Sequence, residues 1–223
     1  MTTPTTAHGT TSRPARSAIL ITNTPDLTAV VETLTMAFGP DPILDWAFPR
    51  TTAHRDQWMA EFFRITTEML LEHGGQVGVA PEYSAIAVWS PPGEPAMTGE
   101  QEAQYYQRLT EACGDCGDCG DRAVALMRAL DEQHPPNLPP HFHVMFTATR
   151  PEPAAVGRAV LLVRALLKME ALRGYGLYAE ASTPQNRDLW LEMGMRRVGD
   201  EIVLPDGGPS LYPIWREPDP SAA

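Results

Sequence analysis

Two histidines, His141 and His143, are the residues of this chain best suited to carry protons. A histidine titrates near neutral pH, so His143 can accept a proton from a substrate directly or through a water molecule. Residues 141–149 are rich in apolar side chains and predict a strand, in which side chains two positions apart share a face. A hydrogen-bonded structural histidine explains His143 as well as a general base does. His141 is expected nearer an entry loop, and two histidines without a third ligand are weak evidence of a metal site.

The residues after this strand suit the binding of an anion. Arg150-Pro-Glu-Pro153 forms a turn, and residues 154–172 then have the composition of a long apolar helix. A strand that turns into a helix directs unpaired backbone N–H groups and the positive end of the helix dipole at one point. That point suits a pyrophosphate, because contacts to backbone N–H groups need no side chain.

Length and composition predict one domain of α/β type. The chain has 223 residues, of which 43% are hydrophobic, and a net charge of -11. That charge argues against nucleic acid and against an anionic membrane surface, and it permits a cationic partner. No apolar run approaches the roughly 18 residues of a membrane span, and residues 1–17 lack the apolar core of a secretory signal. Three cysteines in one short loop do not predict a disulfide framework, so a reducing cytoplasm fits best.

The periodicity of apolar residues defines the elements that would position these groups. A tail at residues 1–17 precedes a domain at 18–218, which includes a variable helical and Cys-rich insertion at about 94–140, and residues 219–223 form a second tail. Asp45, Trp46 and Phe48 are expected in a loop. The pattern predicts helices at 26–38, 53–72, 99–130 (interrupted), 154–172 and 184–192, strands at 18–21, 76–79, 84–89, 141–149 and 177–181, and a hairpin of 196–204 with 210–216.

A Gly-Asp-Cys unit repeats around Cys113, Cys116 and Cys119. Such a repeat is typical of an insertion in a surface loop, which is the interpretation we favour. The alternative is a metal site, because Cys-x-x-Cys-x-x-Cys resembles part of an iron–sulfur run. The chain has no fourth cysteine to complete it.

Several short motifs follow one another in a set order. They are Ala37-Phe38 before Asp41-Pro42, Ala87-Val-Trp-Ser-Pro-Pro-Gly93, His134-Pro-Pro136, Arg150-Pro-Glu152, Glu180-Ala-Ser-Thr-Pro-Gln-Asn186 with Gly194, Leu204-Pro-Asp-Gly207 and Trp215-Arg-Glu-Pro218. Together they resemble the GNAT superfamily of acyl-CoA-dependent N-acyltransferases, and most of all the branch of puromycin N-acetyltransferase and related small-molecule enzymes. The resemblance covers about residues 18–218. It implies a single-domain α/β GNAT fold, whose mixed, mostly antiparallel sheet has a splayed central strand pair and is flanked by helices.

The resemblance also implies acetyl-CoA as cosubstrate. The backbone of Phe146, Thr147, Ala148 and Thr149 would pair with the pantetheine arm. The phosphate loop would be Ala154, Ala155, Val156, Gly157, Arg158 and Ala159; the family's first residue, Gln or Arg, is replaced by Ala154, while Gly157 and Ala159 are kept. Asn186 would lie beside the cofactor thiol. Trp190 stands where the family often has a tyrosine that protonates the departing thiolate, and an indole N–H is no acid of comparable strength.

The implied reaction is direct transfer of an acetyl or other short acyl group to a primary amine of a small molecule. His143 would be the base, and backbone N–H groups near residues 146–149 would polarise the oxyanion. Glu180 would steer a cationic amine, although a structural carboxylate is the commoner role. Asp41, Asp45, Trp46 and Phe48 would overhang the acceptor pocket, where aromatic rings beside carboxylates suit an organic cation; helix breaking and core packing are the plainer explanation of the same residues.

Two other functions fit the departures from the family pattern. The protein could bind ligands without transfer, as a regulatory protein that lost the reaction when Ala154 and Trp190 arose. It could instead use the cleft for chemistry that does not involve CoA. In every case we expect no metal, no nucleic acid, no membrane partner, and a monomer or homodimer.

Overall fold

The computed structural model describes residues 19–93, 97–113, 116–155, 157–168 and 174–218. In that part of the chain eight strands form one mixed sheet in the order β1-β2-β3-β4-β5-β8-β6, and β7 pairs with β8. Every pairing is antiparallel except that of β4 with β5. The strands are β1 (Leu20–Thr22), β2 (Gln76–Val79), β3 (Ala85–Ser90), β4 (His141–Thr149), β5 (Gly176–Ala181), β6 (Arg196–Arg197), β7 (Ile202–Val203) and β8 (Ser210–Arg216). The expected α/β fold with a mostly antiparallel sheet is therefore confirmed.

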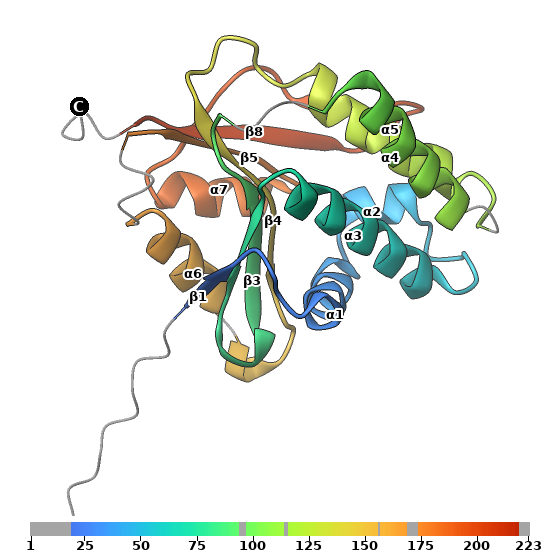
Figure 1. Cartoon of the computed structure of the whole chain (residues 1–223), viewed down its shortest axis with the longest axis horizontal. Coiled ribbons are helices and arrows are strands. Elements are labelled where there is room, and N and C mark those ends of the chain that lie inside the picture. The colour runs from blue at the N-terminus through green and yellow to red at the C-terminus, as the bar shows by residue number, and fades with distance from the viewer. Residues whose placement is uncertain (1–18, 94–96, 114–115, 156, 169–173, 219–223) are drawn as a thin grey trace, which may run out of the picture.

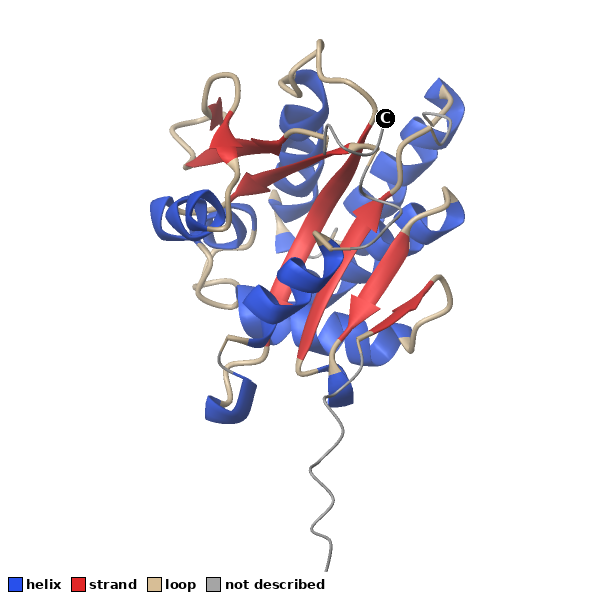
Figure 2. Cartoon of the chain, turned by 90° about the vertical axis from the view of Figure 1, so that its left-hand side faces the viewer, coloured by secondary structure: helices blue, strands red, loops and turns tan. Residues whose placement is uncertain are grey.

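Helices cover both faces of this sheet (Figure 1). The helices are α1 (Leu27–Phe38), α2 (Pro42–Ala47), α3 (Arg55–Glu72), α4 (Gly99–Ala112), α5 (Cys119–Glu132), α6 (Arg158–Leu166) and α7 (Pro184–Glu192), with short 3-10 turns at Pro81–Tyr83 and Pro153–Ala155. Figure 2 looks onto the sheet from the side of α6 and α7. The other helices lie on the opposite face, so each face buries its own apolar core.

The residues that begin the helices explain where they start. Asp26 caps α1, because its carboxylate accepts the Ala29 N–H at 3.2 Å. Thr98 and Gln101 form a capping box at the start of α4. Thr183 caps α7 by accepting the Asn186 N–H at 3.1 Å. The helices predicted at 26–38 and 184–192 are thereby confirmed to within a residue at their ends.

A bulge in β4 divides the strand between the two cores. Val88 pairs with Phe146, but Trp89 pairs with Val144, so Met145 is the extra residue. Val144 therefore packs in the core beneath α6 and α7, whereas Phe146 packs in the core beneath α1 and α3. The bulge exchanges the faces to which the two halves of β4 direct their side chains.

The two central strands separate at the same place. β4 and β5 pair in parallel from His141 with Gly176 to Val144 with Ala179, and the register ends there. Residues 145–149 continue β4 with no partner in β5. This is the splayed strand pair that the family resemblance implies.

Two helical segments differ from the sequence prediction. The expected loop around Asp45 and Trp46 is wrong, because these residues lie in helix α2, where Asp41 accepts the Ile43 N–H at 2.9 Å and Pro42 occupies the first turn. The helix predicted at 154–172 is described only over Arg158–Leu166. Gly157, with φ of 79°, turns the chain into it, and residues 169–173 lie outside the described part.

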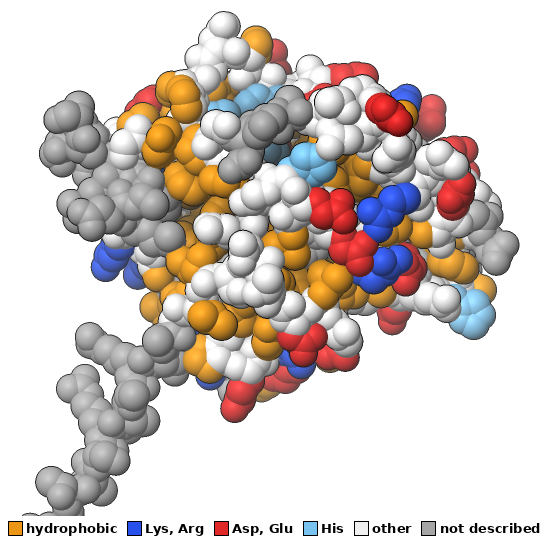
Figure 3. Space-filling view, viewed as in Figure 1, with side chains coloured by type: hydrophobic (Ala, Val, Ile, Leu, Met, Phe, Trp, Pro, Cys, Tyr) orange, Lys and Arg blue, Asp and Glu red, His pale blue; other side chains and the backbone are white. Residues whose placement is uncertain are grey.

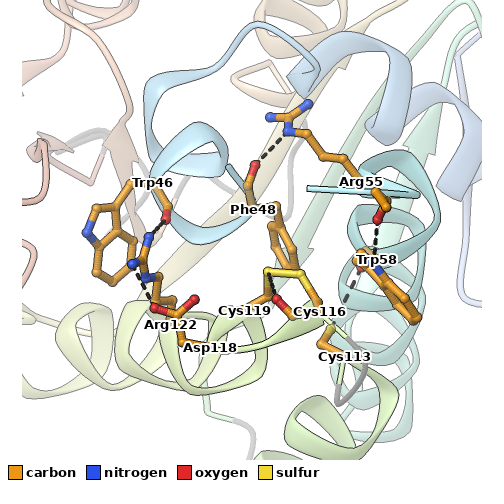
Figure 4. The surroundings of a disulfide bond; sticks show 10 residues. Trp46, Phe48, Arg55, Trp58, Cys113, Cys116, Asp118, Cys119 and Arg122 are labelled. Carbon is orange, nitrogen blue, oxygen red and sulfur yellow. Dashed lines mark hydrogen bonds and ion pairs between the residues drawn. A yellow bond between two sulfur atoms is a disulfide. The ribbon is translucent and has the colours of Figure 1, made fainter. Parts of the chain in front are cut away.

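The cysteine segment also differs from expectation. A disulfide joins Cys116 to Cys119, and Cys113 and Cys119 are buried rather than in a surface loop (Figure 4). Cys119 begins α5, and Arg122 one turn later donates to the Trp46 carbonyl at 2.9 Å. The disulfide differs from the three free cysteines expected, and a cytoplasmic location stays a prediction.

Charged side chains of both signs mingle on the face over α3 and α4 (Figure 3). Arg64 donates to Glu61 and Glu68, and Arg108 donates to Glu68. Within the described residues, no helix is long and apolar enough to cross a membrane. In the same residues, no group of three or more His, Cys, Asp or Glu side chains is arranged to hold a metal ion.

Gly176, the first residue of β5, is expected to tolerate no side chain. A Cβ added there would lie 1.8 Å from the fully buried Trp215 ring. We predict that Gly176→Ala lowers the free energy of unfolding by at least about 2 kcal/mol, measured by urea denaturation. Gly99→Ala is the matched control, because a Cβ there meets no atom within 4 Å, and its stability should not fall. Equal stability of both variants would contradict the packing described.

Candidate active site

A cavity of about 460 Å³ occupies the space where β4 and β5 separate. Val160, Val163 and Trp190 line it from the helices on one face of the sheet, and Phe38, Leu44 and Phe62 from the helices on the other. Residues 144–149 of β4 and 179–182 at the end of β5 form its two edges. The cavity thus crosses the sheet at the splay and is open to groups from both faces.

The half of the cavity beside α6 contains most of the residues predicted to hold acetyl-CoA. Thr147 and Thr149 pair with Ala87 and Ala85, whose side chains belong to the core on this face. Thr149 also fixes the start of α6, because its hydroxyl accepts the Ala159 N–H at 3.1 Å. The predicted residues that line the cavity are Phe146, Thr147, Ala148, Thr149, Gly157, Ala159, Asn186 and Trp190.

Two other described residues of the predicted phosphate loop, Ala155 and Arg158, do not line the cavity. Ala155 is buried at 2% exposure, and Ala154 lies with it in a 3-10 turn. Arg158 donates to the Ser84 hydroxyl at 2.7 Å, so its guanidinium ties the loop to the segment before β3. Val156 lies outside the described residues. Gly157 and Ala159 bring the positive end of α6 to the cavity.

Asn186 and Trp190 project from α7. The Asn186 amide donates to the Ser182 hydroxyl at 3.3 Å, and Ser182 in turn donates to a carboxylate oxygen of Asp41. Trp190 is 7% exposed and fills the cavity wall. Its indole carries one N–H donor and no group that titrates near neutrality, so it cannot replace a tyrosine as a proton source.

On the opposite face, His143 and Glu180 form an ion pair. Leu177, Ala179 and Ala181 pack in the core beneath α6 and α7, so Glu180 points to the other face, as does His143 beside Val144. His143 Nε2 lies 2.9 Å from Glu180 Oε2. The Glu180 side chain is 3% exposed and lines the cavity, while the His143 side chain is 23% exposed and is not among the lining residues.

Only one oxygen of the Glu180 carboxylate is hydrogen-bonded to His143. Glu180 Oε1 is buried and makes no hydrogen bond in the described residues. The buried hydroxyl of Tyr178, whose pKa is raised by burial and by Glu180, lies beside the same carboxylate. Burial alone would lower the pKa of His143, but the charge of Glu180 and the hydrogen bond to it outweigh burial and leave the pKa raised. A carboxylate that lines a cavity and has a hydrogen bond to only one of its oxygens is placed to receive a cation or a proton.

Two further histidines, His134 and His141, lie beside the His143–Glu180 pair. His134 and His141 stack with ring centroids 5.1 Å apart, and their Nε2 atoms lie 3.1 Å from one another. A carbonyl only accepts, so the contact of His141 Nδ1 with the Pro139 carbonyl at 2.8 Å places a proton on Nδ1. A neutral His141 then accepts from His134. Burial lowers the pKa of both rings, and His141, expected in an entry loop, is the first residue of β4.

The predicted acceptor-side residues are not together. Asp41 lines the cavity and is buried at 9% exposure. Asp45 instead binds Arg55 at 2.7 Å and Arg50 at 2.8 Å. Figure 4 shows Trp46 beside Arg122 and Phe48 beside the disulfide. Asp45, Trp46 and Phe48 do not line the cavity, because α2 and the residue that follows it direct these side chains toward α3 and α5.

The sequence analysis did not predict that residues of α5 line the cavity. Leu126, Met127 and Leu130 of α5 line the cavity although they fall in the segment predicted to be a variable insertion. Their spacing of one, three and four positions is helical and could have identified one buried face. Ser182, which joins Asp41 to Asn186, carried no signal of its own.

The fold is that of known N-acetyltransferases. A structure of histone acetyltransferase HPA2 and related acetyltransferase from Corynebacterium glutamicum matches at a TM-score of 0.64 and 18% identity, over 90% of this chain and 96% of that one. Arylalkylamine N-acetyltransferase 2 from Aedes aegypti matches at 0.55 and 13%, over 89% and 98%. Mosquito arylalkylamine N-acetyltransferase like 5b matches at 0.50 and 13%, over 90% and 100%.

These likenesses establish the GNAT fold and nothing finer. No protein-family model matches the sequence, and no curated protein matches it significantly. At identities of 13% and 18% the shared property is the arrangement of helices and strands. The chemistry has to be argued from the residues in the cavity.

The pKa of His143 should depend on Glu180. In Glu180→Gln the charge that opposes burial is removed, so the pKa of His143 should fall below 6.5 instead of lying above it. Proton NMR titration of the imidazole C–H signals measures this, with the His143→Asn spectrum as assignment and the surface change Glu217→Gln as control. An unchanged pKa in Glu180→Gln would contradict the pairing.

The same pair predicts a pH dependence of stability. The folded-state pKa of His143 is raised, so its contribution is complete below the unfolded pKa of 6.5 and is lost as pH rises through the folded value. The excess stability of the wild type over Glu180→Gln should therefore shrink as pH rises from about 6 through that folded value. A difference that grows over this range would show that the pair is not formed.

Proposed function

We propose that this protein is a divergent GNAT-superfamily enzyme that transfers an acetyl or other short acyl group from acyl-CoA to a primary amine of a small molecule. One observation carries the proposal. A single cavity is lined by the strand edge of β4 that has no partner in β5 and by Glu180, whose buried carboxylate is hydrogen-bonded to His143. Those are the two groups that aminolysis of a thioester needs: donors for the oxyanion and an acceptor for the ammonium proton. A closer relation to the puromycin N-acetyltransferase branch stays a prediction.

Acetyl-CoA would occupy the half of the cavity beside α6. The backbone of Phe146 to Thr149 would pair with the pantetheine arm, since β5 leaves that edge unused. The pyrophosphate would lie at the loop of Ala154, Ala155, Val156, Gly157, Arg158 and Ala159. Contacts there would come from backbone N–H groups and the helix end, so loss of the family's Gln or Arg at Ala154 weakens binding without abolishing it. Asn186 would contact the region of the thioester.

The amine would enter from the other face and attack directly. Its ammonium proton passes to the carboxylate of Glu180, which lines the cavity and is hydrogen-bonded to His143 through Oε2. The amine nitrogen then forms a C–N bond to the thioester carbonyl carbon, and backbone N–H groups of β4 hold the oxyanion. The nitrogen of this intermediate is positively charged and loses a second proton to water. The C–S bond breaks as the carbonyl reforms, and the neutral amide and the thiolate leave. His143, predicted as the base itself, acts here through Glu180.

The departing thiolate would take its proton from water. By the family resemblance Trp190 stands where many members have a tyrosine, and its indole is no acid at neutral pH. A thiol has a pKa of only about 8.5, so the thiolate can leave before it is protonated, and a missing acid slows the reaction far less than a missing base. Trp190 would instead close the cavity wall and limit the entry of water.

A second candidate function is binding without transfer, which the replacement of tyrosine by Trp190 favours. The two functions differ in turnover. If Trp190→Tyr raised acetyl transfer sharply from a negligible level, the wild-type protein would be a binding protein that has lost the reaction. Similar rates in wild type and Trp190→Tyr would favour an enzyme that does not need the acid.

Acetyl-CoA should bind with micromolar affinity. Calorimetric titration of the purified protein measures the dissociation constant, and adenosine diphosphate at the same concentration tests how much the pantetheine arm adds. Because the splayed strand edge binds only that arm, adenosine diphosphate should bind at least about ten times more weakly. No heat of binding at millimolar acetyl-CoA would contradict the proposal and favour chemistry without CoA.

Loss of the carboxylate should remove turnover and spare cosubstrate binding. We predict that Glu180→Gln lowers kcat/KM for the amine by about 10²–10⁴-fold, the usual contribution of a general base. The affinity for acetyl-CoA should stay within about twofold, since Glu180 points to the face of the sheet opposite α6 and contributes no proposed contact to the cosubstrate. Thiol release from acetyl-CoA measures the rate, and Glu217→Gln is the control. Full activity in Glu180→Gln would rule out the proposed base.

A further inference from the structure

The acceptor half of the cavity has apolar walls. Phe38, Ile43, Leu44, Phe62, Leu126 and Leu130 line it from four different helices. Phe62, Ile43, Leu44 and Leu126 are each 4% exposed or less. A molecule that fills this half therefore replaces water with hydrocarbon contacts over most of its surface.

Charge in the cavity is limited to two carboxylates. Of the lining residues that the structure describes, only Asp41 and Glu180 have an ionisable side chain. In the described part of the chain the Glu180 carboxylate is hydrogen-bonded to His143 through Oε2, and Oε1 makes no hydrogen bond. This carboxylate at the cavity wall is the acceptor for one ammonium.

Asp41 is not a second such site. One of its carboxylate oxygens accepts the Ile43 N–H at 2.9 Å, and the other accepts the Ser182 hydroxyl. Burial raises the pKa of Asp41, and the hydrogen bonds only partly oppose that effect. Both oxygens of Asp41 are thus already engaged, one in capping α2 and one in holding Ser182, so Asp41 is a poorer partner for a second ammonium than Glu180 is for the first.

We infer that the acceptor is a monoamine, a primary amine whose only charge is the reacting ammonium and whose body is alkyl or aryl, and that diamines and polyamines are poor substrates. This inference rests on the proposed function and names its substrate class. A second ammonium placed against the leucine and phenylalanine side chains would lose its water without gaining a counter-charge. An uncharged methyl end in the same place gains from burial instead.

Hexylamine and hexamethylenediamine test this directly, because they share a six-carbon chain and differ only in the second amino group. The rate of thiol release from acetyl-CoA is measured with each amine at a pH where both are fully protonated in solution. We expect kcat/KM to be at least about 100-fold higher for hexylamine, as for other apolar pockets that must take in an unpaired polar group. Equal rates, or faster reaction of the diamine, would overturn the inference and leave the proposed function intact.

Absence of thiol release from either amine would refute the proposed function, and amine binding then decides the inference separately. In calorimetry with CoA present, tighter binding of hexylamine than of the diamine would support it. Equal binding, or no binding of hexylamine, would overturn it.

A carboxylate added to the cavity wall should shift the preference from the monoamine toward the diamine. Met127 lines the cavity from α5 and is 6% exposed. Met127→Glu adds a counter-charge for a second ammonium, and Met127→Gln adds the same shape and polarity without charge. The ratio of kcat/KM for diamine over hexylamine should rise about tenfold or more in Met127→Glu relative to Met127→Gln. Retained acetyl-CoA binding shows that both variants are folded, and the same ratio in both would contradict the assigned charge selectivity.

Discussion

The structure depends on one constraint in strand β4. An extra residue at Met145 and the end of pairing with β5 after Val144 occur side by side. The first feature sends Thr147 and Thr149 to the face of α6 while His143 stays on the opposite face. The second opens the sheet between those two sets of side chains. A cavity with chemically different ends follows from these two backbone features together, and neither alone would produce it.

The electrostatics of the cavity follow from the same geometry. Because β4 and β5 still pair at His143 and Tyr178, Glu180 lies within hydrogen-bond reach of His143 across the parallel register. A buried carboxylate needs compensation, and this imidazole supplies it to one oxygen only. Asp41 illustrates the contrasting case, since its two oxygens are taken by the α2 backbone and by Ser182. One carboxylate is thus structural and the other is left open to a ligand, in surroundings that are otherwise apolar.

The sequence predicts the elements better than the site. Strand β4 and helices α1 and α7 have clear periodicity or caps, and their bounds follow from it. The bulge cannot be recognised in the sequence. Buried and partly exposed residues alternate through Met145 as they would in a regular strand. Helices cover both faces of the sheet, so a buried residue on one face has the same apolar character as a buried residue on the other. Glu180 pairs with a residue 37 positions away, which no local pattern encodes. The start of α2 was readable from Asp41-Pro42, whereas the burial of Cys113 and Cys119 depends on tertiary packing.

The central claim is that acyl donor and amine occupy one cavity together and react without a covalent enzyme intermediate. Initial rates with acetyl-CoA and hexylamine both varied test this most directly. Direct attack across the splay predicts double-reciprocal lines that intersect, because both substrates must be bound before thiol is released. Parallel lines, with thiol released before the amine binds, would mean that the acyl group passes through a residue of the protein, and would contradict the account.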